Sequence, residues 1–180
     1  MRTKKELLTG EWAVLALLCE KPAHGYAIAA MVAPGGEIGR IWSLSRPLVY
    51  RALDVLASLG LIEVQGRIAD QRAPRRTEMR ASAQGKRLVA DWLVTPEPHV
   101  RDLRANLLLK ILFLHRRHRS ATPLLEAQRD QLVAQSAALA TRAPEVDDDF
   151  VHLWRLTVTN AALGFVEDAL ARDRDKEDRA

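Results

Sequence analysis

The chain has 180 residues, of which 48% are hydrophobic, enough to bury a core and to exclude a wholly disordered protein. Lysine and arginine number 27 against 23 aspartates and glutamates, so the net charge is only +4 with neutral histidines. The one cysteine, Cys19, cannot form an internal disulfide, which is typical of a reducing compartment. No apolar run has the roughly 18 residues of a membrane helix, and the charged start does not resemble a signal peptide. We therefore expect a cytoplasmic protein with no membrane partner.

The positive charge is concentrated in the first half of the chain. Residues 1–95 carry 14 basic and 9 acidic side chains, a balance of +5, whereas residues 96–180 carry 13 and 14. Residues 66–87 alone hold seven basic and two acidic side chains. A local basic cluster on a nearly neutral protein favours a polyanion site, and a solvated arginine-rich loop is the alternative.

Two helices are predicted at the start of the chain. Apolar residues recur at helical spacing over residues 9–20, with Thr9 as a candidate N-cap and Pro22 as the terminator. A second helix is predicted from His24 to Val32, before a Pro-Gly-Gly breaker. Residues 41–44 then alternate between apolar and polar, which predicts a short strand.

The clearest element is an amphipathic helix that opens at Ser45. Serine is a good N-cap, Pro47 suits the first turn, and Gly60 is a natural residue just past the C-terminus. At 100° per residue, the predicted buried side comprises Leu48, Ala52, Val55, Leu56 and Leu59. The predicted polar side comprises Arg46, Tyr50, Arg51, Asp54 and Ser58.

A basic hairpin follows this helix. Residues 61–65 and 75–81 have strand character, and the polar residues 67–74 between them form the loop. Ser82 then caps another helix that runs through Leu93. Pro96 and Pro98 mark a domain boundary, so we expect one domain over residues 1–95 and a second over residues 96–180.

The second half is predicted to contain three helices, at about 100–118, 122–141 and 147–172. The last helix carries two parallel apolar stripes, which need burial on more than one side. Three such helices do not bury themselves easily, so we expect this helical domain to have a partner.

Helix, helix, short strand, helix and basic hairpin, in this order, predict a mostly α protein with a winged helix-turn-helix domain followed by an α-helical domain. The N-terminal residues of the third helix would read base edges in the major groove, and the hairpin, or wing, would contact phosphates. Candidate reading residues are Ser45, Arg46, Tyr50 and Arg51, and candidate wing residues are Arg72, Arg75 and Arg76. The alternative for Arg46 and Arg51 is surface solubility, with an intrahelical pair from Arg51 to Asp54.

Several of these segments resemble the PadR-like transcriptional regulators over residues 7–95. They are residues 10–18 (GEWAVLALL), 22–28 (PAHGYAI), 42–53 (WSLSRPLVYRAL) and 60–63 (GLIE). The resemblance implies a winged-helix homodimer, usually a repressor, that responds to a small organic ligand. It places Ser45, Arg46, Tyr50 and Arg51 in the groove and residues 74–76 at the wing.

Residues 101–103 and 107–113 resemble, more loosely, the C-terminal helices that one branch of this family uses for dimerisation. A two-fold dimer presents two reading helices about one DNA turn apart, ~34 Å, so the expected partner is double-stranded DNA with a palindromic operator. A small aromatic or lipophilic effector is also expected.

Other conspicuous side chains receive simpler interpretations. Trp92 and Trp154 are candidate ligand contacts near the dimer seam, with interface packing as the alternative. His24 is interpreted as a helix-start residue, and Tyr26, Trp12 and Trp42 as core.

No cofactor is expected. The pair His115 and His118 lacks a neighbouring carboxylate or cysteine, so no metal site is predicted. The sequence has no phosphate loop, nucleophile elbow or metal triad, which argues against an enzyme. A winged-helix module that binds only other proteins remains the competing interpretation.

Overall fold

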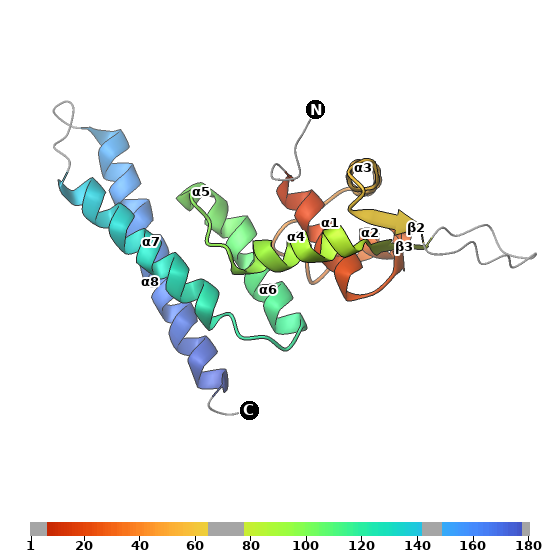
Figure 1. The fold of residues 1–180 in the computed structure, drawn as a ribbon. Coiled ribbons are helices and arrows are strands. Elements are labelled where there is room, and N and C mark those ends of the chain that lie inside the picture. Colours follow the sequence, from red (N-terminus) through yellow and green to blue (C-terminus); the bar gives the residue numbers. More distant parts are fainter. Residues whose placement is uncertain (1–6, 65–77, 142–148, 178–180) are drawn as a thin grey trace, which may run out of the picture. The chain divides into compact units, whose positions relative to one another are not determined.

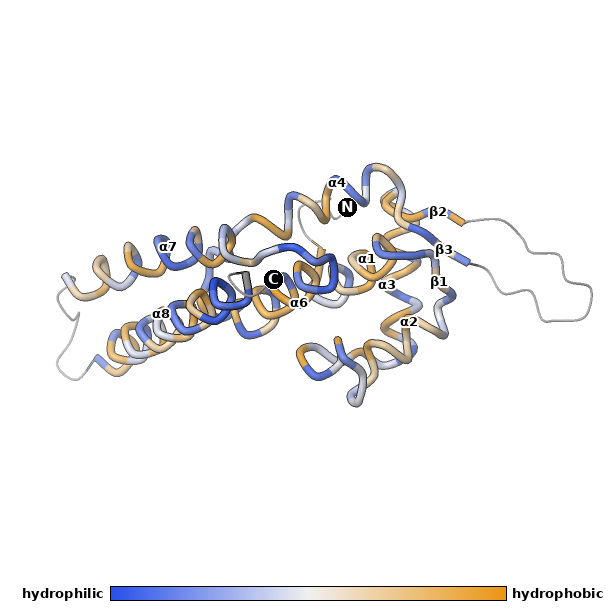
Figure 2. The backbone as a smooth tube through the Cα atoms, turned by 90° about the horizontal axis from the view of Figure 1, so that it is seen from below, coloured by the Kyte–Doolittle hydropathy of each residue, from blue (hydrophilic) through white to orange (hydrophobic). Residues whose placement is uncertain are grey.

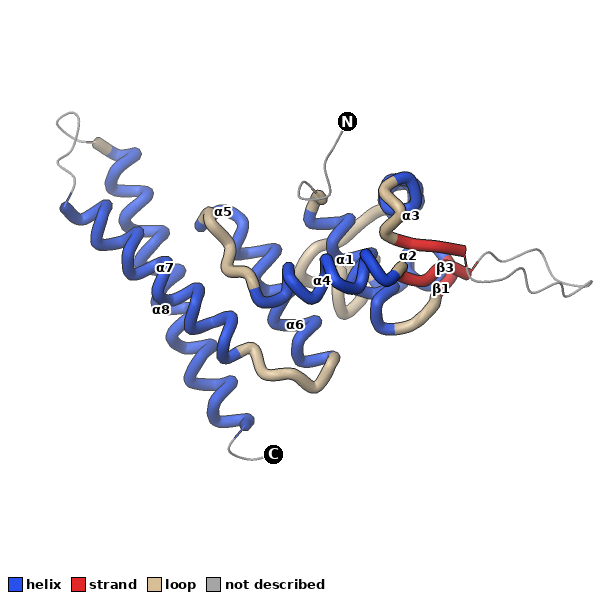
Figure 3. Tube along the Cα trace, in the orientation of Figure 1, coloured by secondary structure: helices blue, strands red, loops and turns tan. Residues whose placement is uncertain are grey.

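A computed structural model describes residues 7–64, 78–141 and 149–177. The chain divides into two compact units, residues 1–92 and residues 93–180 (Figure 1). Most of the described residues are helical, and the strands form one small sheet in the first unit (Figure 3). The predicted fold class, a winged helix followed by a helical region, is confirmed. None of the helices in the described ranges combines the length and hydrophobicity that crossing a bilayer requires.

The first unit has the element order of a winged helix. Its elements are α1 (Thr9–Glu20), β1 (Ala23–His24), α2 (Gly25–Met31), α3 (Arg46–Ser58), β2 (Ile62–Val64), β3 (Glu78–Ala81) and most of α4 (Ala83–Val94). The strands lie in the antiparallel order β1-β3-β2, with Glu63 opposite Arg80 and Ala23 opposite Met79.

Helix α1 is the centre of this unit. Every residue from Gly10 to Leu18 is buried, and Figure 2 colours most of α1 as hydrophobic. Leu8, not Thr9, is the N-cap residue, so this detail of the prediction is wrong. The Glu11 carboxylate accepts a hydrogen bond from the Leu8 backbone N–H at 2.8 Å, and this contact closes the helix start without the threonine hydroxyl.

The predicted strand at residues 41–44 is also wrong. The backbone N–H groups of Ile41 and Trp42 both bond to the Ile38 carbonyl, so this segment is a turn. The third strand of the sheet is instead β1, immediately before α2. Alternating hydrophobicity predicts a strand only where a neighbouring strand offers ladder bonds, and β3 offers them to β1 and β2.

Helix α3 begins after Ser45 and ends at the predicted glycine. Gly60 has φ +66°, its N–H bonds to the Ala57 carbonyl at 2.9 Å, and the Leu61 N–H bonds to the Leu56 carbonyl at 2.9 Å. These two bonds form a Schellman motif, in which a left-handed residue satisfies the last carbonyls of the helix.

The buried side of α3 is rotated from the predicted one. The buried residues are Val49, Ala52, Leu53 and Leu56, whereas Leu48 is 47% exposed. The helix packs mainly against α1 and α2, whose positions determine which side of α3 is covered.

Helix α4 has the predicted serine cap. The Ser82 hydroxyl accepts a hydrogen bond from the Gly85 N–H at 3.1 Å and donates one to the Gly60 carbonyl at 2.8 Å. The same side chain therefore starts α4 and supports the end of α3. Further along α4, the ring of Trp92 stacks on that of Trp12, with centroids 4.9 Å apart.

The second unit contains α5 (Val100–Asp102), a π-helical segment η1 (Leu103–Leu107), α6 (Leu108–Arg116), α7 (Thr122–Thr141) and α8 (Phe150–Glu177). The helix predicted over residues 100–118 is thus interrupted by one π-helical stretch. Helices α7 and α8 run side by side in opposite directions and make the most extensive helix contact of the chain (Figure 1).

A buried ion pair fixes the segment that leads into this unit. The Lys110 ammonium pairs with the Glu97 carboxylate and donates to the Thr95 carbonyl at 2.6 Å. Gln128 of α7 accepts from the Glu97 N–H at 2.7 Å and donates to the Glu97 carbonyl at 3.1 Å. Burial lowers the pKa of Lys110, and Glu97 opposes this effect. These contacts hold residues 95–97 against α6 and α7.

A second buried cluster surrounds Asp173 of α8. Its carboxylate accepts hydrogen bonds from His115 Nε2 at 2.6 Å, the Ala121 N–H at 2.7 Å and the Ser120 hydroxyl at 3.1 Å. Burial by itself would raise the pKa of Asp173, but these hydrogen bonds outweigh it and leave the pKa below its usual range. The side chain joins the end of α6 and the start of α7 to α8.

Replacing Gly60 by alanine tests the end of α3. A Cβ meets no neighbouring atom there, but the left-handed backbone disfavours any L side chain. We expect Gly60→Ala to lower the free energy of unfolding by about 1–2 kcal/mol in denaturant titrations. Gly35→Ala is the control, because that site is equally open and its φ is not positive. Equal losses of stability in the two variants would contradict a role for the left-handed backbone of Gly60 at the end of α3.

The Asp173 cluster predicts a pH-dependent stability. Because its folded-state pKa is depressed, Asp173 stabilises the fold fully above the usual aspartate range, and this stabilisation is lost as the pH falls through the folded pKa. We expect Asp173→Asn to lower the melting temperature at neutral pH and the difference from the wild type to shrink on acidification. A constant difference across pH would show that the carboxylate charge is unimportant.

Candidate nucleic-acid interface

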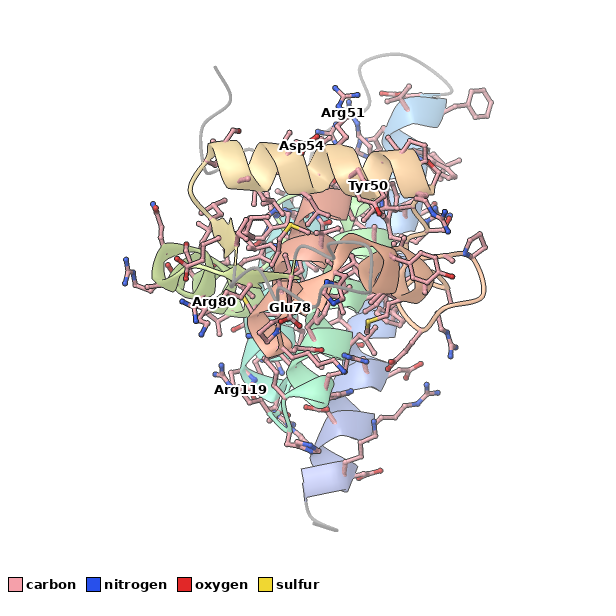
Figure 4. All side chains as sticks on the ribbon, turned by 90° about the vertical axis from the view of Figure 1, so that its right-hand side faces the viewer. Tyr50, Arg51, Asp54, Glu78, Arg80 and Arg119 are labelled. Atoms are coloured by element: carbon pink, nitrogen blue, oxygen red, sulfur yellow. The ribbon has the colours of Figure 1, made fainter. Side chains whose placement is uncertain are left out.

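One side of α3 faces outward from the first unit. Ser45, Arg46, Tyr50 and Arg51 are all exposed, as the sequence predicts for a reading helix. Figure 4 shows Arg51 projecting from the outer side of α3, with Asp54 one turn further along the same side. The opposite side of α3 is packed against α1 and α2, so these polar groups are presented on a rigid element.

The Arg51 guanidinium has no ion-pair partner among the described residues. Asp54 lies three residues away, at a spacing where a salt bridge is possible, but the two side chains form none. The intrahelical pair that would explain Arg51 as a solubility residue is therefore not formed. Both charges are left facing solvent.

Arg46 is supported by an aromatic ring that the sequence assigned to the core. Its guanidinium carbon lies 5.0 Å from the ring centroid of Tyr26, at cation–π distance. Tyr26 is 66% exposed, so the prediction that it is a core tyrosine is wrong. In α2 the buried positions are Gly25, Ile28 and Ala29, and Tyr26 points outward between them. Its place next to α3 could not be read from helical spacing in a helix of seven residues.

Gly25 allows α2 and α3 to approach closely. A Cβ at this position would lie 2.8 Å from Cε1 of Tyr50 and 3.3 Å from Cδ1 of Leu53. Only a residue without a side chain leaves room for the Tyr50 ring, which covers Gly25 while remaining 45% exposed. The His-Gly-Tyr segment, residues 24–26, thus contributes to the outward face in two ways. Gly25 leaves room for the Tyr50 ring, and Tyr26 is itself exposed on that face.

Two surface hollows flank the start of α3. One of about 320 Å³ lies between α2 and α3 and is lined by Tyr26, Ser45 and Arg46 among others. The other, of about 400 Å³, lies between the start of α1 and α3 and includes Leu48 and Arg51 in its wall. The N-terminal half of α3 therefore stands as a ridge with free space on both sides.

The wing is described only at its base. Strands β2 and β3 pair there, and Arg80 donates to Glu63 across them at 2.9 Å. This arginine of the basic segment is therefore partly neutralised. The predicted phosphate-contacting residues Arg72, Arg75 and Arg76 lie outside the described residues, and their role stays a prediction.

The two candidate ligand tryptophans lie in different surroundings. Trp92 is 7% exposed and stacked on Trp12 in the first unit, whereas Trp154 of α8 is 68% exposed in the second. Their role in binding a ligand stays a prediction.

The two histidines at the end of α6 have different surroundings. His115 binds Asp173, and His118 adopts φ 52° after the end of α6. Within the described ranges, no three His, Cys, Asp or Glu side chains are grouped as metal ligands.

Comparison with known proteins finds similarity at the level of structure. No protein-family model and no curated protein matches the chain. A crystal structure of Bacillus subtilis PadR with operator DNA aligns with a TM-score of 0.45 and 22% identity, over 90% of this chain and 97% of that one. PadR with p-coumaric acid aligns with a TM-score of 0.44 and 21% identity, over 93% and 99%. PadR alone gives 0.43 and 21%, over 97% and 98%. Each of these alignments covers nine-tenths or more of this chain.

Proposed function

We propose that this protein is a sequence-specific DNA-binding transcriptional regulator, a repressor of the PadR type. The observation that carries the proposal is Arg51, which is exposed on the outer side of α3 in a winged-helix domain and has no ion-pair partner among the residues that the structure describes. An exposed guanidinium has five donors and is suited to bind the acceptors of DNA. Arg46 adds a second cation on the same helix, supported by Tyr26.

In this proposal α3 enters the major groove. Arg51 donates two hydrogen bonds to O6 and N7 of a guanine, the commonest specific contact in that groove. Ser45, Arg46 and Tyr50 lie at the same end of α3 and enter the groove together with Arg51. Arg72, Arg75 and Arg76 of the wing neutralise the flanking backbone.

The regulator acts as a homodimer through its second unit. Helix α8 leaves a row of large apolar side chains exposed, comprising Phe150, Val151, Leu153, Trp154 and Phe165. Figure 2 shows orange segments in the same part of α8. Exposed apolar surface of this kind indicates an interaction site, and a second copy is the partner that gives two reading helices. The operator is then a palindrome with half-sites about one helical turn apart.

A small organic effector relieves repression. PadR has been solved with p-coumaric acid, and a small aromatic or lipophilic molecule is the corresponding ligand for this chain. Trp154 on the exposed side of α8 offers a flat apolar surface for such a ring, and Trp92 is the second candidate. Binding of the effector at the dimer interface would change the distance between the two reading helices. Because the two half-sites of a palindrome are a fixed distance apart, this change would weaken DNA binding.

Selection of bound duplexes from a random DNA pool tests the function. We expect a palindromic sequence to be enriched, with affinity that falls steeply as salt rises, by a log–log slope of about −0.9 for each neutralised phosphate. A winged helix that binds only proteins would enrich no sequence, and its interactions would depend much less on salt.

Substitution of Arg51 tests the reading face. We expect Arg51→Ala to weaken operator binding by about 1–3 kcal/mol and to relax sequence preference at one position of each half-site. Arg75→Ala is the contrast, since the loss of a phosphate contact weakens binding to all sequences about equally and lowers the salt slope by about one. Unchanged operator affinity in Arg51→Ala, measured by fluorescence anisotropy, would rule out this assignment.

A further inference from the structure

We infer that Asp54 determines sequence specificity by selecting a cytosine in the base pair next to the guanine that Arg51 reads. The inference rests on the proposed function and extends it from DNA binding to the composition of the operator. It assigns to each half-site two adjacent G·C pairs read by one turn of α3.

The position of Asp54 carries the first step. Arg51 and Asp54 are both exposed and lie three residues apart on α3, on its outer side (Figure 4). Three residues of a helix span ~4.5 Å along its axis and differ by about 60° in direction. Successive base pairs are ~3.4 Å apart. Two side chains with this offset face neighbouring base pairs when the helix lies along the groove.

The free carboxylate carries the second step. Asp54 has no hydrogen-bond or ion-pair partner among the described residues, and Arg51, the nearest cation on its helix, is not paired with it. A carboxylate entering the groove must therefore find a donor on the DNA, because an unpaired charge in a closed interface is costly.

The chemistry of the major groove selects the base. An ionised carboxylate only accepts hydrogen bonds. Guanine and thymine present only acceptors at this edge, so they repel it, and adenine places its N7 acceptor directly beside its N6 amino donor. Cytosine presents the N4 amino donor without an acceptor on the same base, and carboxylates are its usual partners. Asp54 thus complements Arg51, which provides only donors.

Two other roles for Asp54 lead to different measurements. If the carboxylate only repels nearby phosphates, its removal strengthens binding to every sequence alike. If it only orients the Arg51 guanidinium on the DNA, its removal weakens the preference for guanine at the Arg51 position. Base selection by Asp54 instead changes the preference at a neighbouring position and leaves the guanine preference intact.

The experiment compares operator profiles of the full-length protein and three variants. The operator is first recovered from a random pool with the wild type, and every half-site position is then changed to the other three base pairs for anisotropy titrations. The variants are Asp54→Asn, Asp54→Ala and Asp130→Asn. The last is a matched control, because Asp130 is an exposed residue of α7, on neither α3 nor α8, and its substitution changes the net charge equally.

We expect the wild type and Asp130→Asn to prefer cytosine roughly tenfold or more at one position adjacent to the guanine that Arg51→Ala ceases to select. Asp54→Ala should lose this preference. Asp54→Asn should change it to adenine, because an amide both accepts from N6 and donates to N7. This gain of a new preference would occur only in a folded variant that binds DNA.

The outcomes separate this inference from the proposed function. If no sequence is enriched by the wild type, the proposed function itself fails. The inference is overturned, and DNA recognition stands, if an operator is recovered but both Asp54 variants keep the wild-type base preferences. The same holds if both variants bind all sequences more tightly by an equal factor, or if they lose only the guanine preference at the Arg51 position.

Discussion

The burial of one side of α3 against α1 and α2 is the constraint on which the candidate interface depends. Val49, Ala52, Leu53 and Leu56 are removed from water there, and the hydrophobic gain fixes the rotation of the helix about its axis. The opposite side must then face solvent. Arg51 is presented outward because Val49 and Leu53, on the opposite side of the helix, are held inward. No contact of its own is needed to place it.

The ends of α3 are fixed as firmly as its buried side. Gly25 lets the start of α2 lie against Tyr50, and Gly60 turns the chain into β2 immediately after the last helical turn. The Ser82 hydroxyl then bonds to the Gly60 carbonyl, so that α4 begins from the same point. A helix that reads DNA by a few side chains requires this rigidity, because displacement by one ångström would separate donors from acceptors.

The second unit is held together by buried polar contacts as well as by apolar packing. Lys110 and Glu97 fix the incoming segment to α6 and α7, and Asp173 joins α8 to the start of α7. Such contacts contribute more to a unique arrangement than to net stability, because burying the charges offsets much of their attraction. They leave the large apolar residues at the start of α8 exposed, and these are the surface we assign to a second copy.

Sequence reasoning succeeded where the signal is local. Ser45 and the terminal glycine located the two ends of α3, although the Ser45 hydroxyl makes no capping hydrogen bond within the described residues. Ser82 identified α4, and helical spacing located α7 and α8. It failed where two neighbouring residues compete for burial. Leu48 and Tyr26 were both expected to be buried, and both are exposed. The 100° step of a helix leaves the exact centre of the buried side undetermined by about one residue, and only packing partners decide it.

The sequence by itself determined the main helices, their order and the basic character of the first half, because capping, helix termination and periodicity depend on residues a few positions apart. Only the tertiary structure decided that Tyr26 supports Arg46, that β1 instead of residues 41–44 completes the sheet, and that Arg51 and Asp54 do not pair with each other on the outer side of α3. These outcomes depend on which segments distant in the chain come into contact, and the free energy of those contacts is absent from any local pattern.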